Sequence, residues 1–589
     1  MILFTHHPRL TLALILIAYL ISATLFALLT PAWQMPDEPA HYNYIAHIAR
    51  GDGLPVLAMG DFDMDYIGQI VGARFPPEMS VEVMRYEFYQ PPLYYISAVP
   101  VYWLAGGTAD AAHPESYGHA LIALRLYGVG LGVITLLLLY SCAATAFPDQ
   151  PLIRLGATAF AATLPMHVAM TAALNNDSLA ILLLLASSLV LLKWIASHAK
   201  TNGSDGSDFD ENQREREFFF GFLYKPNRMT ALLGILLGLG LLTKIYAYVF
   251  LPVCVIVVFL AAWRNADIRS GLLQSSWVII PAILLGLPLW LRNMSLYGLL
   301  DPLGLAWHDL VVAGQPTTAE WVAQYGWAAY WERAFGFTFR SFWGVFGWLG
   351  LFWDSRLYAA VRILTITIGL GLLQMLFRWV WLRFRGSQKE ERDGDPYSFG
   401  NSFRLWSTLF FGITLIAILL SYSLYNLKFV QHQGRYFFWG MLPISLLFAL
   451  GWRQLMGRTE AFLAALALLI LGAYSIIAGD QNLWTLLSYL VMATLLLLQG
   501  LLCWILKSSY TISTGGDGFN GQISAQINEQ ANGQKGWERL SPQPLRALFM
   551  HPVVIRTATL MCPLIWAFPF IGLNILGIYS LFGYIIPQL

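Results

Sequence analysis

The chain has 589 residues, of which 57% are hydrophobic and only 12% are charged, and its formal net charge at pH 7 is +1. Ordinary soluble domains are less apolar and about twice as rich in charged residues, so this composition excludes a soluble globular protein. The near-zero net charge also gives no indication of a nucleic-acid partner. Apolar runs of about twenty residues recur from end to end, as bilayer spans require. We therefore predict an all-α polytopic membrane protein.

The first apolar run extends from Leu10 to Leu29. It is long, and Pro31-Ala32-Trp33 does not fit a signal-peptide cleavage site, so we expect a retained first span. A polar and aromatic segment, residues 30–90, comes next. It is too long for a simple turn, and loops of such length are usually functional.

An acidic pair, Asp37-Glu38, opens this segment between Pro36 and Pro39. Proline is tolerated in the first turn of a helix, so a helix is predicted to begin here, with His41 one turn further on. Two interpretations stand side by side. Either the pair supplies the catalytic acids of a membrane enzyme, or Asp37 caps the helix and Glu38 complements its positive end.

The remaining spans follow from the later apolar runs, which lie near residues 119–147, 152–172, 178–198, 229–244, 246–263, 273–291, 357–382, 405–424, 436–452, 460–479, 483–506 and 552–587. The stretch Leu93 to Leu104 is short for a crossing. If it does not cross, nearly all basic clusters face the cytoplasm. We therefore predict about 13 transmembrane helices, with residues 93–104 as a juxtamembrane helix at the outer surface.

Two long outer loops that contain juxtamembrane helices, residues 30–90 and 292–355, result from this orientation. We expect four parts in the chain. A catalytic transmembrane module occupies residues 1–300, and an outer aromatic loop with further spans occupies residues 301–507. A polar cytoplasmic loop, residues 508–548, has the composition of a disordered segment, and a C-terminal transmembrane segment covers residues 549–589.

The same orientation brings several polar residues to the outer side. Asp177 begins a span, where it is either a site acid or a helix cap. Lys244, Arg292 and Arg435 lie at span ends on the side that usually has few cations. Each is either a snorkelling side chain or a ligand for a lipid-borne phosphate.

Aromatic residues surround Glu87 and Gln90 in Tyr86-Glu87-Phe88-Tyr89-Gln90-Pro91-Pro92. Aromatic side chains form a membrane belt, but they also stack on sugars; Trp343 and Trp348 invite the same two interpretations. His167, beside Pro165, is interpreted as a satisfied histidine near a kinked helix end.

Several signatures are absent from the sequence. It has no GxxxxGK[ST] phosphate loop, no GxGxxG after a strand and no HExxH, which disfavours ATP-driven, nucleotide-sugar and zinc-protease chemistry. The four cysteines lie in apolar runs without a CxxC, which argues against a disulfide framework and a zinc site.

Motif order gives the chain a resemblance to a known family, carried by Pro36-Asp37-Glu38-Pro39-Ala40-His41-Tyr42, Gln90-Pro91-Pro92-Leu93-Tyr94-Tyr95, Ala123-Leu124-Arg125-Leu126, Asn176-Asp177, Leu242-Thr243-Lys244 and Gln433-Gly434-Arg435-Tyr436. The chain resembles the GT-C superfamily of membrane glycosyltransferases, in particular the protein O-mannosyltransferase and aminoarabinose transferase branch. The resemblance covers residues 1–300 and is loose beyond them.

The resemblance implies transfer of a sugar from a polyprenyl-phosphate carrier to a glycan, lipid or protein acceptor at the outer face of the plasma (inner) membrane. Asp37 and Glu38 would be catalytic, and Asp177, His41, Glu87 and Gln90 would be associated with the acceptor or a cation. The carrier phosphate would bind Lys244, Arg292 and Arg435. No cofactor is identified with certainty; a divalent cation held by Asp37 and Asp177 is the alternative use of these acids.

The main rival function is a transporter or flippase of a lipid-linked glycan. Such proteins often contain internal repeats and polar groups near the membrane midplane. We find no such repeat, and the informative charges lie at span ends. The sequence does not identify the sugar, the acceptor or the oligomeric state.

Overall fold

A computed structural model describes residues 7–107, 114–200, 226–384, 401–479, 482–513 and 551–588. Helices make up most of this part of the chain, and the strands within it form one two-residue hairpin, which confirms the all-α prediction. The predicted disordered loop lies outside the described residues from position 514 onward, as do residues 201–225 and 385–400 of two predicted cytoplasmic loops.

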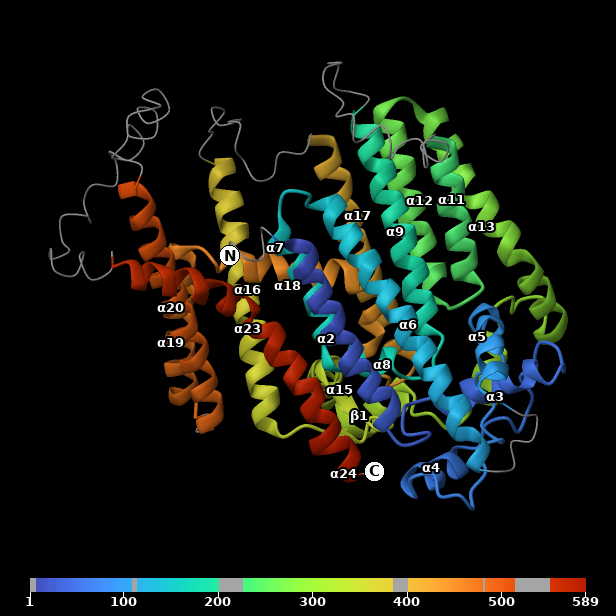
Figure 1. The fold of residues 1–589 in the computed structure, drawn as a ribbon. Helices are drawn as coiled ribbons and strands as arrows, with labels where there is room; N and C mark the ends of the chain where they lie inside the picture. The colour runs from blue at the N-terminus through green and yellow to red at the C-terminus, as the bar shows by residue number, and fades with distance from the viewer. Residues whose placement is uncertain are drawn as a thin grey trace. The chain divides into compact units, whose positions relative to one another are not determined.

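The chain divides into two compact units, each built from segments that are not consecutive in sequence. The larger unit comprises Leu12–Trp353, Glu391–Leu447 and Gly572–Leu589, and the smaller comprises Met1–Thr11, Asp354–Glu390 and Phe448–Ile571. In chain order the helices of the larger unit, drawn in Figure 1, are α2 (Pro8–Leu29, which begins in the smaller unit), α3 (Glu38–Ala49), α4 (Met64–Gly72), α5 (Leu93–Leu104), α6 (Pro114–Ala146), α7 (Pro151–Thr163), α8 (Pro165–Thr171), α9 (Asp177–Lys200), α11 (Pro226–Leu241), α12 (Tyr246–Asn265), α13 (Ile268–Tyr297), α14 (Leu305–Val311), α15 (Thr318–Trp343), α17 (Asn401–Lys428), η1 (Gly434–Gly440), η4 (Leu581–Ile585) and α24 (Ile586–Gln588).

The smaller unit contains α16 (Ser355–Phe384), α19 (Arg458–Ile477) and α20 (Leu483–Ser513). Two helices, α18 (Met441–Gln454) and α23 (Pro552–Ser580), have residues in both units. Within the smaller unit α19 packs along α20, and both contact α16. A Cβ atom at Gly371 would lie 2.1 Å from the carbonyl oxygen of Gly451, so glycine is required where these backbones meet.

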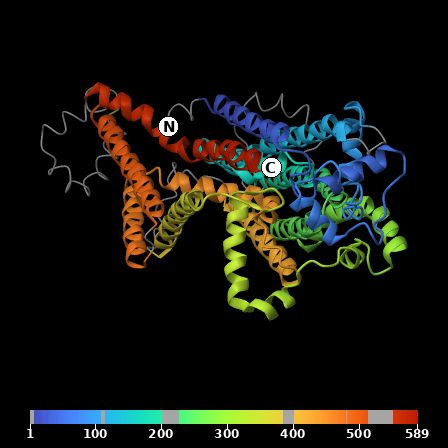
Figure 2. The ribbon, with the colours of Figure 1, turned by 90° about the horizontal axis from the view of Figure 1, so that it is seen from below.

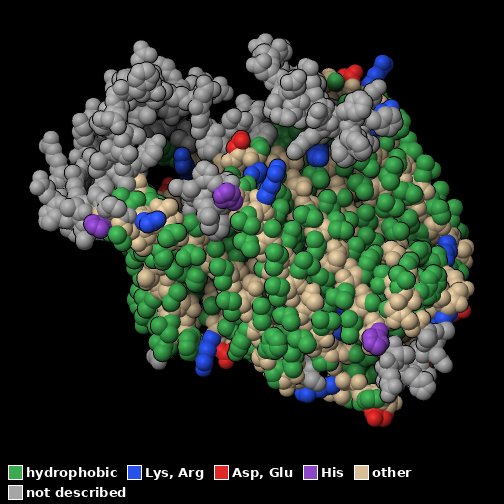
Figure 3. Space-filling view, in the orientation of Figure 1, with side chains coloured by type: hydrophobic (Ala, Val, Ile, Leu, Met, Phe, Trp, Pro, Cys, Tyr) green, Lys and Arg blue, Asp and Glu red, His purple; other side chains and the backbone are tan. Residues whose placement is uncertain are grey.

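Among the described residues, ten helices are long and apolar enough to cross a bilayer, or up to eleven if the bent pair α7 and α8 counts as one span. The angle within that pair is 66°, and Pro165, the first residue of α8, explains the break. The two other predicted spans are shorter helices, α11 with 16 residues and α18 with 14. Figure 3 shows hydrophobic side chains over most of the visible face, with charged side chains near the helix ends.

Small residues allow α11 and α13 to pack closely. Gly234 and Gly238 are four residues apart and share one face of α11. A Cβ at Gly234 would lie 2.3 Å from the carbonyl oxygen of Val278, and one at Gly238 would lie 2.8 Å from Leu285. Glycines with this spacing let membrane helices approach until their backbones touch, and this packing fixes the α11–α12 link that carries Lys244.

The segment between α2 and α5 folds into a small layer of its own. Helix α3 begins at Glu38 with a proline in its first turn, as predicted, and packs against α5, which has the bounds predicted for the juxtamembrane helix. Stacked rings join the two helices, because the Tyr44 and Tyr95 ring centroids are 3.7 Å apart. Both helices lie side by side in Figure 1. A rigid aromatic layer therefore supports the start of α3.

The second long segment, residues 292–355, contains a longer helix than a loop with short helices would. Helix α15 has 26 residues and carries a capping box in which Thr317 and Glu320 bond each other's backbone. It bends at Gly326, whose φ of 80° is left-handed, and Figure 2 shows its two arms at a sharp angle. Strands β1 (Val345–Phe346) and β2 (Leu351–Phe352) then pair in antiparallel register.

Candidate functional site

The two residues of the acidic pair have different environments. Glu38 is fully buried and forms a two-point ion pair with Arg125 of α6, with distances of 2.8 Å to Nε and 2.6 Å to Nη2. Its carboxylate also accepts hydrogen bonds from the backbone amides of Trp33 and Leu174. The remaining Arg125 donors bind the carbonyl oxygens of Ala27, Thr30 and Pro31.

This arrangement assigns Glu38 a different task from the one predicted. Its oxygens already accept four hydrogen bonds, and its side chain has no exposed surface. A general base must reach the proton that it removes, and Glu38 is not placed to do so. It instead ties the end of α2, the start of α3 and the α8–α9 link to Arg125.

Asp37 occupies the N-cap position of α3, but its side chain makes no capping hydrogen bond. Its backbone is left-handed, with φ of 65°, a conformation that aspartate tolerates better than most residues. The carboxylate accepts a 3.1 Å hydrogen bond from the Tyr86 hydroxyl and lies 3.0 Å from Nη2 of Arg435. The capping interpretation of its side chain is therefore wrong, and 26% of the side chain remains exposed.

The surroundings of Asp37 keep it ionised. Burial by itself would raise the pKa of this carboxyl, but the charge of Arg435, the neighbouring His41 and the hydrogen bonds from Arg435 and Tyr86 hold it below its ordinary value. Burial and the nearby carboxylate raise the pKa of the Tyr86 phenol well above its usual range, so this hydroxyl stays protonated and donates. Asp37 is thus a partly exposed, oriented carboxylate.

A second ion pair lies across the α8–α9 and α11–α12 links. Nζ of Lys244 is 3.2 Å from Oδ1 of Asp177 and donates to Oδ1 of Asn176 at 2.5 Å. Asn176 in turn donates to Gln90 at 3.4 Å, so the segment between α2 and α5 reaches this pair. Lys244 is only 13% exposed, which is not the position of a snorkelling side chain.

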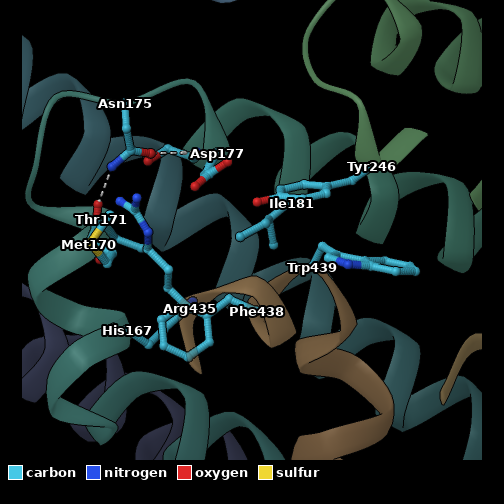
Figure 4. Close-up of a pocket in the computed structure, with 11 residues that line it drawn as sticks. His167, Met170, Thr171, Asn175, Asp177, Ile181, Tyr246, Arg435, Phe438 and Trp439 are labelled. Atoms are coloured by element: carbon cyan, nitrogen blue, oxygen red, sulfur yellow. Dashed lines mark hydrogen bonds between the residues drawn. The ribbon is translucent and has the colours of Figure 1, made fainter. Parts of the chain in front are cut away.

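A narrow cavity lies beside these charges, lined by His167, Met170, Thr171, Asn175, Asp177, Ser178, Ile181, Tyr246, Arg435, Phe438 and Trp439. Figure 4 shows Arg435 and Asp177 at its border, with Tyr246 and Trp439 on the opposite side from His167. The Tyr246 and Trp439 rings stack with centroids 6.1 Å apart. One cation, Arg435, one acid, Asp177, and an aromatic wall therefore enclose one space.

His41 and Glu87 lie close enough to these charges to interact with them. Burial lowers the pKa of His41 to about 3, helped by Lys244, so the ring is neutral at pH 7 and its Nδ1 is 2.9 Å from the Tyr95 hydroxyl. Burial raises the pKa of Glu87, and the charge of Asp37 adds to the effect. Asp37 and Glu87 are thus neighbouring acids whose pKa values shift in opposite directions, an arrangement common in catalytic sites.

Replacement of Glu87 by glutamine should stabilise the protein at pH values well above the ordinary carboxyl pKa of 4.5. Because the pKa of Glu87 is raised in the folded state, the folded chain binds more protons than the unfolded chain above the ordinary value of 4.5, and stability falls as pH rises through this window. The thermal unfolding midpoint of Glu87→Gln should therefore exceed that of wild type by an amount that grows as pH rises. The exposed Glu78 offers the control, since Glu78→Gln should leave the midpoint unchanged. A Glu87→Gln variant less stable at pH 8 would contradict the expectation.

Arg292 is not brought to the cavity. Its guanidinium donates to the carbonyl oxygens of Leu54 and Pro55 at 3.0 and 2.7 Å, and so it holds the segment between α2 and α5 against α13. Of the two tryptophans, Trp343 is 3% exposed, and Trp348 donates to the Trp33 carbonyl oxygen at 2.8 Å. These three residues have structural contacts that account for them.

The acids do not form a metal-binding set. Asp37 and Asp177 each face a cationic side chain, and within the described residues no three His, Cys, Asp or Glu side chains gather where one ion could bind them. A hard divalent cation prefers several oxygen ligands. The residues therefore do not fit the predicted cation, and no step below uses one.

Several residues of the site had no assigned role in the sequence. Tyr86 and Arg125 bind the acidic pair, and Tyr246 and Trp439 form the cavity wall. Arg125 had a recognisable signal, because an arginine inside an apolar run is costly unless it is paired within the protein. The aromatic residues had none, since aromatics are abundant throughout this chain.

Comparisons with known proteins give weak similarities. No family model matches the chain, and no curated protein matches it significantly. Among solved structures, the Archaeoglobus fulgidus oligosaccharyltransferase in its apo form has 13% identity and a TM-score of 0.42, over 82% of this chain and 56% of that chain. The same enzyme in complex with Zn and sulfate has 14% identity and a TM-score of 0.40, over 84% of this chain and 55% of that one.

ArnT from Cupriavidus metallidurans, bound to undecaprenyl phosphate, has 13% identity and a TM-score of 0.35, over 87% of this chain and 72% of that chain. The chain spans little more than half the length of the Archaeoglobus fulgidus oligosaccharyltransferase. Identities of 13–14% and TM-scores below 0.5 do not define an activity.

Proposed function

We propose that this chain is a membrane glycosyltransferase that moves a sugar from a polyprenyl-phosphate-linked donor to an acceptor at the outer face of the membrane. The observation that carries the proposal is the convergence of charges from distant segments. Asp37 pairs with Arg435, Lys244 pairs with Asp177, and both Arg435 and Asp177 line the same cavity.

The proposed role of Asp37 is that of the general base. It is ionised and partly exposed, and Tyr86 fixes one of its oxygens. It would accept the proton of an acceptor hydroxyl as that oxygen attacks the anomeric carbon of the donor sugar. The bond from this carbon to the carrier phosphate breaks, and its electron pair leaves with the polyprenyl phosphate.

The cations would bind and stabilise that phosphate. Arg435 lines the cavity, and Lys244 contacts Asp177 of the same lining. Positive charge near a leaving phosphate stabilises the developing negative charge. A bound phosphate would also compete with Asp37 for Arg435. The pKa of Asp37 would then return toward its ordinary value, which makes the carboxylate a stronger base once the donor is present.

The supporting residues would act by positioning. Glu38, with Arg125, holds the start of α3 and thereby the direction of Asp37. Gln90 and Asn176 hold Lys244, and Asp177 balances its charge. We assign no contact with the donor to Arg292.

The experiment that tests the function uses purified protein reconstituted in liposomes with a panel of polyprenyl-phosphate sugars labelled in the sugar. Release of polyprenyl phosphate together with label on an acceptor from a membrane extract supports the proposal. Translocation of the intact lipid-linked sugar, without bond cleavage, would instead identify the rival transporter or flippase. Turnover of nucleotide sugars alone would contradict the proposed donor.

Replacement of Lys244 by alanine should weaken donor binding by about 10- to 100-fold, which corresponds to the loss of one charge-assisted contact of about 1.5–3 kcal/mol. The KM for the acceptor should change little. Lys193→Ala, at an exposed position of α9, is the matched control and should behave as wild type. If the donor KM of Lys244→Ala is unchanged, the proposed contact with the donor is wrong and this lysine is only a structural partner of Asp177.

A further inference from the structure

The cavity wall carries buried polar atoms that lack hydrogen-bond partners among the residues the structure describes. They are Nε2 of His167, Oγ of Ser178 and Nε of Arg435. A buried polar group without a partner costs about 1–3 kcal/mol, so native proteins rarely leave one unpaired. Three such atoms around one cavity indicate a polar ligand.

The tautomer of His167 follows from its other nitrogen. Nδ1 lies 2.8 Å from the carbonyl oxygen of Ala161. A carbonyl oxygen only accepts hydrogen bonds, so Nδ1 carries the hydrogen. The ring is 1% exposed and, among the described side chains, has no carboxylate within hydrogen-bond distance, which favours its neutral form. Nε2 is then a hydrogen-bond acceptor, and it needs a donor from the ligand.

The three atoms together describe the chemistry of that ligand. His167 offers an acceptor, Arg435 offers a donor, and Ser178 offers either. Adjacent hydroxyl groups on a ring satisfy such a mixed set, because each hydroxyl both donates and accepts. Tyr246 and Trp439 supply an aromatic wall, against which the C–H face of a sugar ring packs.

We propose that Nε2 of His167 accepts a hydrogen bond from a hydroxyl of the transferred sugar, and that this contact selects sugars carrying that hydroxyl. The assignment to the donor sugar rests on the proposed function, since Arg435, the residue assigned to the donor phosphate, borders the same cavity. His167 is thus a specificity-determining residue. A site built to pair a substrate hydroxyl discriminates strongly against a ligand that lacks it.

Two variants of His167 separate this contact from a structural role. In His167→Asn the new amide would keep a donor near the position of Nδ1 for the Ala161 carbonyl oxygen but provide no acceptor at the position of Nε2. His167→Gln places an amide oxygen near that second position. Binding of free monosaccharides to the detergent-solubilised full chain is measured by saturation-transfer NMR titration, with hexoses, pentoses and their monodeoxy analogues as probes.

We expect saturable binding of at least one sugar to wild type and to His167→Gln, and binding at least ten-fold weaker to His167→Asn. One monodeoxy analogue should bind wild type as weakly as the parent sugar binds His167→Asn, and that variant should not distinguish the two ligands. Equal binding to wild type and His167→Asn, or no saturable binding of any sugar, overturns the inference. His167-dependent binding without transfer from any lipid-linked donor overturns the proposed function and leaves the sugar subsite standing.

Discussion

Asp37→Asn is expected to reduce lipid-linked sugar transfer by about 10²- to 10⁴-fold, the usual contribution of a general base. Asparagine has nearly the same shape and still accepts the hydrogen bond from the Tyr86 hydroxyl, but it cannot take up a proton. The ion pair with Arg435 is also lost, so donor phosphate should bind at least as tightly as before. The initial rate of sugar transfer and the donor KM, measured together, test both statements.

The matched control is Asp65→Asn, the same substitution at an exposed position of the same outer segment, which should transfer sugar at the wild-type rate. A pH profile adds an independent check. The pKa of Asp37 is lowered in the free protein, so kcat/KM should show no loss from this group until the pH falls below the ordinary carboxyl value. Full activity of Asp37→Asn in the presence of normal amounts of protein would end the catalytic assignment.

Arg125→Leu should be among the most destabilising single substitutions in the chain, at about 3–5 kcal/mol, because it leaves the Glu38 carboxylate buried without a counter-charge. It also removes the donors of three backbone carbonyl oxygens. The thermal unfolding midpoint of the detergent-solubilised protein and its yield from membranes should both fall. Arg50→Leu, which breaks the exposed pair with Asp52, should cost well under about 1 kcal/mol.

The double variant Arg125→Leu with Glu38→Leu separates charge from shape. It removes both buried charges, so it should be more stable than Arg125→Leu alone, although the amides of Trp33 and Leu174 then lose their acceptor. If the double variant recovers part of the stability that Arg125→Leu loses, the buried Glu38 carboxylate without a counter-charge caused that part of the loss. A double variant less stable than either single variant would show that the hydrogen bonds to backbone dominate instead.

The spans and the start of α3 could be predicted because both depend on local signals. Continuous apolar runs mark the helices, and Pro39 marks the first turn of α3. The short helix α5 also has its predicted bounds. The second long segment, residues 292–355, was harder to predict. The capping box at Thr317 starts a long helix there, which hydropathy alone would not suggest.

The separate environments of Asp37 and Glu38 could not be predicted from sequence. The residues are adjacent, yet the left-handed backbone of Asp37 directs its side chain away from that of Glu38. Their partners, Arg435 and Arg125, lie 398 and 87 residues away. Such partners depend on tertiary packing, so adjacency in the sequence does not reveal that the pair contains one partly exposed carboxylate and one buried anchor.

The distance in sequence between Asp37 and Arg435 also bears on how the protein is made. Asp37 leaves the ribosome roughly 400 residues before its partner does, and most helices of the larger unit are synthesised in between. A nascent chain that has reached α17 already contains Asp37, Asp177 and Lys244 but not yet the guanidinium that completes the cavity wall. The site can therefore be completed only late in biosynthesis, after most of the transmembrane helices have been synthesised.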